Sequence, residues 1–260
     1  MRTAAGKDAL AVLTFHSISS EPGPTSIGAA TFRMQMGVLA ESGFRSMTCQ
    51  DFLDWREGRA TSATQRVLIT FDDGYDDFGT VAFPILREHG FSCLVFVPTG
   101  KLGAREDWRG ANTSARPLMS WSTVIELARA GIEFGAHGVT HADLTSLATD
   151  RRRHEIERCA QELAEKIGHR TRSFAAPYGH VNQAVLADIA QTYDVAFGTR
   201  FDRAHPTCDL FDVPRIEMHY FREPRHWRAV VRGDRSYFLV RRMLRAAKSA
   251  GTSAARAVLD

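Results

Sequence analysis

The sequence lacks several features that would assign it to whole classes of protein. It has no apolar run of about 18 residues, so no segment is predicted to span a membrane. Its four cysteines are widely spaced and form no CxxC pair, which argues against a disulfide framework and against a cysteine-rich zinc site. The first apolar run, residues 10–15, is too short for the core of a signal peptide, and we therefore expect a cytoplasmic protein.

The composition is that of an ordinary globular protein, with 44% hydrophobic and 24% charged residues. The net charge of +3 hides a basic C-terminal region, because residues 221–260 hold ten Lys and Arg but three Asp and Glu. We expect residues 236–260 to form a basic amphipathic helix that either is simply solvated or contacts an anionic membrane surface. No aromatic-interleaved basic patch is present, so we expect no nucleic-acid partner.

Short apolar runs alternate with helix-length amphipathic segments. Strands are expected at residues 10–15, 67–71, 92–97, 132–135, 173–175 and 195–198. Helices are expected at residues 31–42, 122–130, 150–167 and 182–191. Ser120 is expected to cap the second of these helices, and Thr149 or Asp150 the third. The alternation predicts an α/β fold with a parallel sheet, and its six or seven units favour a distorted (β/α) barrel of about seven strands.

Two adjacent carboxylates, Asp72 and Asp73, follow the apolar strand at residues 67–71. Chemistry in parallel α/β folds gathers where strands end, and neighbouring side chains on an extended backbone point in different directions. One aspartate can therefore face a metal ion while the other faces a water molecule. The alternative is a polar Asp-Asp-Gly turn without function.

His137 and His141 follow the strand at residues 132–135, among small residues that leave room around them. Two histidines and one carboxylate form a known catalytic zinc set, although a histidine pair of this spacing also arises by chance. A third segment, SFAAPYGH, places Pro177 and Tyr178 after a short strand. The Tyr178 backbone N–H could stabilise an oxyanion, or the segment is a plain turn.

Taken in order, the segments LTFHSI, TFDDGY, HGVTH, FAAPYG and VPRIEMH resemble the polysaccharide deacetylase family (NodB-homology domain, carbohydrate esterase family 4), exopolysaccharide-type subfamily. The resemblance implies a NodB-type barrel within residues 1–235, a divalent metal ion, usually Zn²⁺, and hydrolysis of an N-acetyl group on a sugar. It implies metal ligation by Asp73, His137 and His141. It also implies that Asp72 is the base for the attacking water and that Tyr178, after Pro177, binds the oxyanion through its N–H.

The sequence departs from the family where many members carry an arginine, because Ala175 stands at that position. Arg215 resembles the late arginine of the subfamily, and we expect it to pair with Asp72; the alternative is a surface arginine. Two histidines are candidates for the general acid. His16 resembles the histidine of the subfamily's first motif, and His219 is a candidate by its order in the chain.

We expect the substrate to be an N-acetylhexosamine in a glycan or glycan precursor, at the inner face of the membrane if the basic segment binds lipid. Trp108 and Trp121 are candidates for stacking on a sugar ring, or they are packed in the core. Two alternatives remain open. One is a hydrolase of a non-sugar amide, such as a formamide or a cyclic ureide, on the same fold. The other is a glycan-binding relative that has lost its catalytic activity.

Overall fold

The computed structural model describes residues 9–21, 25–59, 63–108, 115–231 and 233. The chain divides into two compact units, Met1–Tyr220 and Phe221–Asp260. In the second unit the structure describes one helix, α7 (Pro224–Val231). The expected amphipathic helix at residues 236–260 lies outside the described residues, so this helix and the domain boundary at residue 235 stay predictions. Within the described ranges, no helix is both long and apolar enough to cross a membrane.

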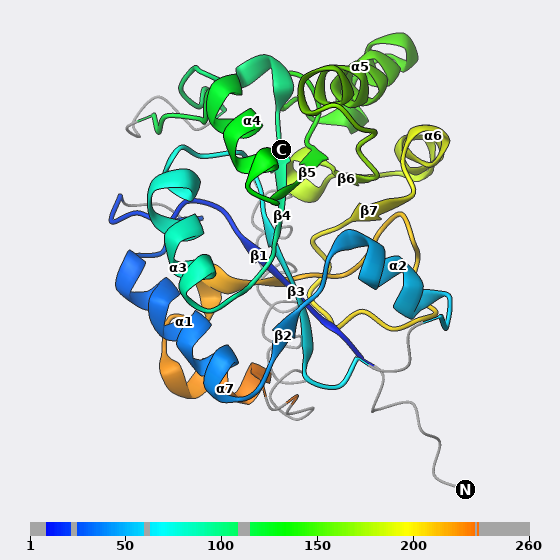
Figure 1. Ribbon diagram of the computed structural model, residues 1–260. Helices are drawn as coiled ribbons and strands as arrows, with labels where there is room; N and C mark the ends of the chain where they lie inside the picture. Colours follow the sequence, from blue (N-terminus) through cyan, green and yellow to red (C-terminus); the bar gives the residue numbers. More distant parts are fainter. Residues whose placement is uncertain (1–8, 22–24, 60–62, 109–114, 232, 234–260) are drawn as a thin grey trace, which may run out of the picture. The chain divides into compact units, whose positions relative to one another are not determined.

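The first unit is built on a parallel sheet that curls into a half-barrel, with helices around it (Figure 1). The strand order is β7-β6-β5-β4-β3-β1-β8, and β2 pairs with β3 beside this path. The strands are β1 (Ala11–Phe15), β2 (Arg45–Ser46), β3 (Arg66–Phe71), β4 (Leu94–Val97), β5 (Glu133–Ala136), β6 (Ser173–Ala175), β7 (Val195–Phe197) and β8 (Ile216–Glu217). Val213, just before β8, forms a bridge with Phe197 of β7, which brings the two ends of the sheet together.

The helices lie between successive strands in the chain, as the alternation of segments predicts. The α-helices of the first unit are α1 (Ala29–Glu41), α2 (Cys49–Arg56), α3 (Phe83–Glu88), α4 (Trp121–Arg129), α5 (Thr149–Ile167) and α6 (Gln183–Thr192). The shorter turns are η1 (Phe78–Ala82), η2 (Thr99–Lys101), η3 (Leu144–Ser146), η4 (Pro177–Gly179) and η5 (Met218–Tyr220). The six strands and four helices expected from the sequence are all present, with small differences at their ends.

Helix caps show where local reasoning succeeded and where it failed. Ser120 caps α4 as expected, because its hydroxyl accepts a hydrogen bond from the Thr123 N–H. The expectation for α5 was wrong: Thr149 is already helical, and Ala148 occupies the cap position without a side-chain bond. Helix α2 was not expected, although Thr48 and Asp51 form a capping box at its start.

The inner core of the half-barrel is filled by alternate residues of the strands and by α2. Val12, Leu68 and Phe96 belong to one buried cluster together with Phe52 and Trp55 of α2. The Phe52 ring lies 5.6 Å from that of Phe197, so α2 packs against the inner face of β7. Since side chains alternate across a strand, this inner set leaves the intervening residues to pack on the outer helices.

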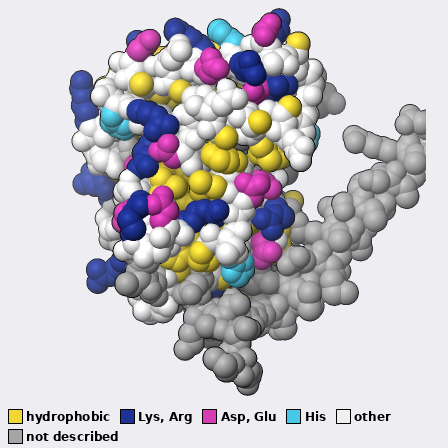
Figure 2. Space-filling view, turned by 90° about the vertical axis from the view of Figure 1, so that its right-hand side faces the viewer, with side chains coloured by type: hydrophobic (Ala, Val, Ile, Leu, Met, Phe, Trp, Pro, Cys, Tyr) yellow, Lys and Arg dark blue, Asp and Glu magenta, His cyan; other side chains and the backbone are white. Residues whose placement is uncertain are grey.

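The surface shown in Figure 2 carries acidic and basic side chains that are interspersed, with apolar side chains between them. Charges of one sign do not gather into a track on this face. A basic track is the usual footprint of a nucleic-acid-binding surface. The expectation of no nucleic-acid partner stays a prediction.

Candidate active site

The fold brings Asp73, His137 and His141 together at the C-terminal edge of the sheet. Each is buried, and one ligand atom from each lies within 4.8 Å of the other two. The Asp73 Oδ1 lies 3.1 Å from the His141 Nε2 and 3.3 Å from the His137 Nε2. Among the described residues, this is the one cluster of His, Cys, Asp and Glu with the geometry of a metal site.

Backbone and side-chain hydrogen bonds orient these three groups. His137 follows β5, and its N–H donates to the Val97 carbonyl of the neighbouring strand at 3.1 Å. Its Nδ1 lies 2.7 Å from the Ala175 carbonyl oxygen. A carbonyl can only accept, so Nδ1 carries a hydrogen, and Nε2, the atom that faces Asp73, is the one left to bind a cation when the ring is neutral. Metal-binding histidines are commonly oriented in this way.

Burial and charge determine the protonation of the cluster. Burial raises the pKa of Asp73, but hydrogen bonds from His137 and His141 outweigh it and hold the pKa well below its usual value. Burial lowers the pKa of both imidazoles. For His137 the hydrogen bond to Asp73 and the charge of Asp72 prevail, so its pKa is raised, whereas the pKa of His141 is lowered. The site therefore holds an ionised carboxylate that favours a cation.

Three residues of the site have left-handed backbone conformations, which are costly for residues with a side chain. The φ angles are +71° at Asp73, +60° at His141 and +61° at Tyr178. Gly74, the residue after Asp73, has a φ angle of +68°. A Cβ atom at this position would lie 2.9 Å from the Val97 side chain. Strain of this kind persists where the surrounding structure enforces it, and such positions cluster at functional sites.

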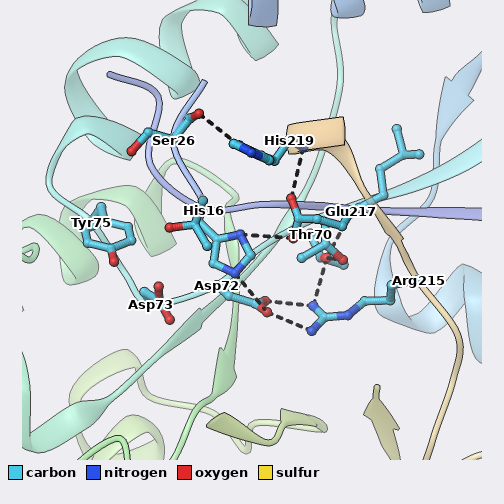
Figure 3. Close-up of polar contacts among 12 residues, drawn as sticks. His16, Ser26, Thr70, Asp72, Asp73, Tyr75, Arg215, Glu217 and His219 are labelled. Carbon is cyan, nitrogen blue, oxygen red and sulfur yellow. Dashed lines mark hydrogen bonds and ion pairs between the residues drawn. The ribbon is translucent and has the colours of Figure 1, made fainter. Parts of the chain in front are cut away.

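Asp72 points to a different partner than Asp73 does. Its two carboxylate oxygens accept from the two terminal nitrogens of Arg215, each at 2.7 Å (Figure 3). Arg215 is 2% exposed, and it also donates to the Gly198 carbonyl and to the Thr70 hydroxyl. Burial raises the pKa of Asp72, but Arg215, His137 and His16 outweigh it and lower the pKa. The pairing expected from the sequence is thus present, and it keeps Asp72 ionised.

The two candidate acids occupy different places (Figure 3). The His16 Nε2 lies 4.0 Å from the Asp72 Oδ2, and its Nδ1 lies 3.4 Å from the Glu217 Oε2. The His219 ring lies 3.3 Å from the Ser26 carbonyl oxygen, and its backbone N–H donates to Glu217. The structure therefore places His16, and not His219, against Asp72.

Aromatic rings flank His141. The Trp108 indole is stacked on its imidazole with ring centroids 3.9 Å apart, and the Tyr178 ring meets it edge-on at 4.8 Å. Tyr178 lies in η4 behind the buried Pro177, and its side chain is 47% exposed. These two rings therefore border the cluster and leave an aromatic surface for a ligand.

A buried ion pair joins Glu106, two residues before Trp108, to Arg116. The Arg116 Nε donates to the Glu106 Oε1 at 2.7 Å, and the Tyr75 hydroxyl donates to the other carboxylate oxygen at 2.6 Å. The guanidinium also lies over the Tyr75 ring, 3.9 Å from its centroid. Tyr75 lies two residues after Asp73. Its contacts therefore connect Glu106 and Arg116 to the segment that carries the aspartate pair.

Trp121 is not brought to the cluster. It begins α4, and its ring lies 5.9 Å from the ammonium of Lys166, near the end of α5. At 1.5 Å per residue, Lys166 lies about 16 Å along α5 from Glu155, the residue of that helix that contacts the HGVTH loop. The structure therefore gives Trp121 a packing contact outside the site.

Sequence reasoning missed Glu217, which faces His16. Arg215 and Glu217 are two residues apart in an extended segment, so their side chains share a face. That spacing was the available signal, because Arg215 was already assigned to the site. Glu155 was also missed, and no short-range pattern connects it with the histidines.

Comparisons with known proteins agree with the geometry. The family model described as "Polysaccharide deacetylase" matches residues 59–196. The chain is 24% identical over 210 residues to the putative polysaccharide deacetylase YxkH of Bacillus subtilis, covering 80% of this chain and 71% of that protein. It is 22% identical over 241 residues to the poly-beta-1,6-N-acetyl-D-glucosamine N-deacetylase of Escherichia coli, covering 78% of this chain but 36% of that protein.

Solved structures share the fold. IcaB from Ammonifex degensii superposes with a TM-score of 0.71 at 25% identity, covering 87% of this chain and 97% of that one. The Streptococcus pyogenes deacetylase PplD, determined in complex with acetate, gives a TM-score of 0.71 at 22% identity, covering 81% and 92%. The matched segment contains the aspartate pair, both histidines and the PYG turn. The chain belongs to the polysaccharide deacetylase family.

Proposed function

We propose that this protein hydrolyses the N-acetyl group of an N-acetylhexosamine in a glycan or glycan precursor, with a divalent cation, Zn²⁺ foremost, held by Asp73, His137 and His141. The observation that carries the proposal is the convergence of these three buried side chains beside a second aspartate that Arg215 holds by both oxygens. The relatives named as deacetylases of poly-beta-1,6-N-acetyl-D-glucosamine support the class of substrate.

The residues present fit a divalent cation. Two imidazoles and one carboxylate are a donor set used by catalytic zinc sites. The donors are preorganised, since Ala175 fixes the His137 ring and Asp73 is already ionised. When bound, such a cation supplies Lewis acidity toward water and toward the amide carbonyl.

The chain's own residues supply the proton transfers. The Asp72 carboxylate accepts a proton from the attacking water, whose oxygen bonds to the carbonyl carbon of the acetyl group. Arg215 keeps Asp72 ionised and fixes both of its oxygens. The carbonyl oxygen gains negative charge, and the Tyr178 N–H donates a hydrogen bond to it. Removing one such donor typically costs about 10²–10³ in rate.

Expulsion of the sugar amine requires a proton. When the carbon–nitrogen bond breaks, His16 in its protonated form gives a proton to the amine nitrogen, and acetate leaves with the new oxygen. The position of His16 supports this role, because its Nε2 lies 4.0 Å from the Asp72 Oδ2 and its Nδ1 lies 3.4 Å from the Glu217 Oε2, directly beside the proposed base. His219 lies against Ser26 and takes no part in this scheme.

The proposal is tested with the purified protein by metal analysis and by product release from a panel of substrates. Acetate is measured for β-1,6-linked N-acetylglucosamine oligomers and single N-acetylhexosamines, formate for formamides, and the ring-opened product for cyclic ureides. We expect acetate from the sugars, zinc bound by wild type and by Asp72→Asn, and no turnover in Asp72→Asn. Asp73→Ala is expected to lose both metal and turnover. Product release from the non-sugar amides alone would show that the substrate is a non-sugar amide. Binding of oligomers without acetate release would indicate a glycan-binding relative without catalytic activity.

A further inference from the structure

Glu155 lies outside every motif of the site, yet its carboxylate accepts hydrogen bonds from the loop between His137 and His141. It belongs to α5 and is 7% exposed. Its Oε2 accepts from the N–H groups of Val139 and Thr140, each at 2.8 Å, and its Oε1 accepts from the Thr140 hydroxyl at 2.7 Å. One side chain thus binds three donors within two consecutive residues.

The opposite side of the same loop is held by backbone groups. The Thr99 N–H donates to the Gly138 carbonyl at 3.2 Å, and the Gly100 N–H donates to the Val139 carbonyl at 2.8 Å. The segment after β4 therefore donates hydrogen bonds to two carbonyls of the loop, and Glu155 accepts hydrogen bonds from two of its N–H groups. Between these two anchors the loop has little freedom to shift either histidine.

Two residues of the loop have positive φ angles, which glycine adopts readily but histidine does not. Gly138 has φ +77°, and a Cβ at this position would lie 3.1 Å from the Glu155 Oε2. His141 has φ +60°, which is unfavourable for a residue with a side chain. The charge-assisted hydrogen bonds to Glu155 compensate for this strain and fix the turn that carries His141 back toward Asp73.

We propose that Glu155 is a positioning residue of the cation site: it acts through the backbone of residues 139 and 140 and sets the separation and orientation of His137 and His141. The proposal rests on the proposed function in so far as those histidines are ligands. Outer groups that orient ligands typically contribute about 10- to 100-fold in metal affinity. Glu155 reaches the ligands through the N–H groups of Val139 and Thr140 and through the Thr140 hydroxyl.

The test compares variants of one helix by their affinity for Zn²⁺, measured by competition with a chromophoric chelator, and by the visible spectrum of the Co²⁺ form. Glu155→Met keeps the volume of the side chain but cannot accept these bonds, and we expect affinity to fall by about 10- to 100-fold with a changed Co²⁺ spectrum. Glu155→Gln keeps an acceptor oxygen and is expected to recover most of the affinity. Glu162→Met is the matched control, since Glu162 pairs with Arg158 on the same helix.

Affinity and spectrum of Glu155→Met equal to those of wild type would overturn the proposal, as would an equal loss in Glu162→Met. Circular dichroism checks that each variant is folded. If Glu155→Met does not fold, Thr140→Val decides, because it removes only the hydroxyl bond; we expect a loss of a few-fold, and unchanged affinity would overturn the proposal. Failure of wild type itself to bind Zn²⁺ or Co²⁺ would instead refute the cation site of the proposed function.

Discussion

The indole of Trp108 lies parallel to the imidazole of His141, with ring centroids 3.9 Å apart and ring planes inclined by 22°. This contact covers one face of a proposed cation ligand with a residue that is itself half-buried. We therefore propose that Trp108 orients His141 and, under the proposed function, also contacts the sugar.

We expect Trp108→Ala to raise KM for an acetylated oligomer by about 2- to 12-fold, the range that corresponds to the 0.5–1.5 kcal/mol typical of an aromatic pair. Trp108→Phe is expected to retain most of the wild-type KM. Steady-state kinetics with Trp121→Ala as control checks the assignment, because Trp121 contacts Lys166 and not the site. Equal KM values in Trp108→Ala and wild type would remove Trp108 from the substrate site.

Arg215 controls the protonation of Asp72. Burial raises the pKa of this carboxyl, and the Arg215 guanidinium provides the largest opposing effect. In Arg215→Met the pKa of Asp72 is therefore expected to rise, so that the base becomes protonated at a higher pH. The acidic limb of the profile of kcat/KM against pH should move upward.

Arg215→Lys is the control for this profile. A lysine keeps the positive charge but loses the two-fold hydrogen bonding, so the acidic limb should move less than in Arg215→Met. An acidic limb that stays in place in both variants would show that Asp72 is not the group that titrates there.

The two candidates for the general acid can be distinguished by kinetics. His16 lies against Asp72, whereas the His219 ring lies against the Ser26 carbonyl. We expect His16→Ala to lower kcat by about 10²–10⁴, the usual contribution of a positioned acid or base. His219→Ala should keep most of its kcat. The reverse order of the two effects would transfer the acid role to His219.

The ion pair of Glu106 and Arg116 is expected to matter for stability. Their side chains are 0% and 4% exposed. Arg116→Met removes the cation that lies 2.7 Å from the buried Glu106 carboxylate, and breaking a buried pair from one side typically costs about 3–5 kcal/mol in the free energy of unfolding. Chemical denaturation measures this. The double variant Glu106→Met with Arg116→Met should recover much of the loss, because it leaves no unpaired charge.

The same pair gives a pH dependence of stability. Burial raises the pKa of Glu106, but hydrogen bonds from Arg116 and Tyr75 outweigh it, so the pKa in the folded protein lies below its ordinary value. Its contribution is then complete above the unfolded pKa of about 4.3 and is lost as the pH falls through the folded pKa. The difference in Tm between wild type and Glu106→Gln should shrink as the pH is lowered from about 5 to about 3. A difference that does not change with pH over this range would contradict the assignment.

Local patterns in the sequence predict the parts of the site that follow directly from single strands. Asp72, Asp73 and His137 come immediately after buried apolar runs, and parallel strands deliver their ends to one edge. His141 was found because it lies four residues from His137. The expected barrel follows from the same alternation, and the curled parallel sheet confirms the class of fold.

The remaining parts depend on tertiary contacts that no local pattern encodes. Glu155 contacts the loop that follows β5, the strand before its own helix. Glu217 contacts His16, which lies at the other end of the chain. The left-handed conformations of Asp73 and Tyr178 are likewise imposed by the surroundings, because their own side chains disfavour them. Helix α2 is a different case, because its start carries a local signal, the capping box of Thr48 and Asp51, that the sequence analysis did not use.

The pairing of Asp72 with Arg215 joins residues that are 143 positions apart, and it has a consequence for the order in which the protein matures. On the ribosome, Asp73, His137 and His141 all emerge before Arg215. The three proposed cation ligands are therefore synthesised before the guanidinium that pairs with Asp72. A fragment ending at residue 196, where the family match ends, would contain those three ligands but not Arg215.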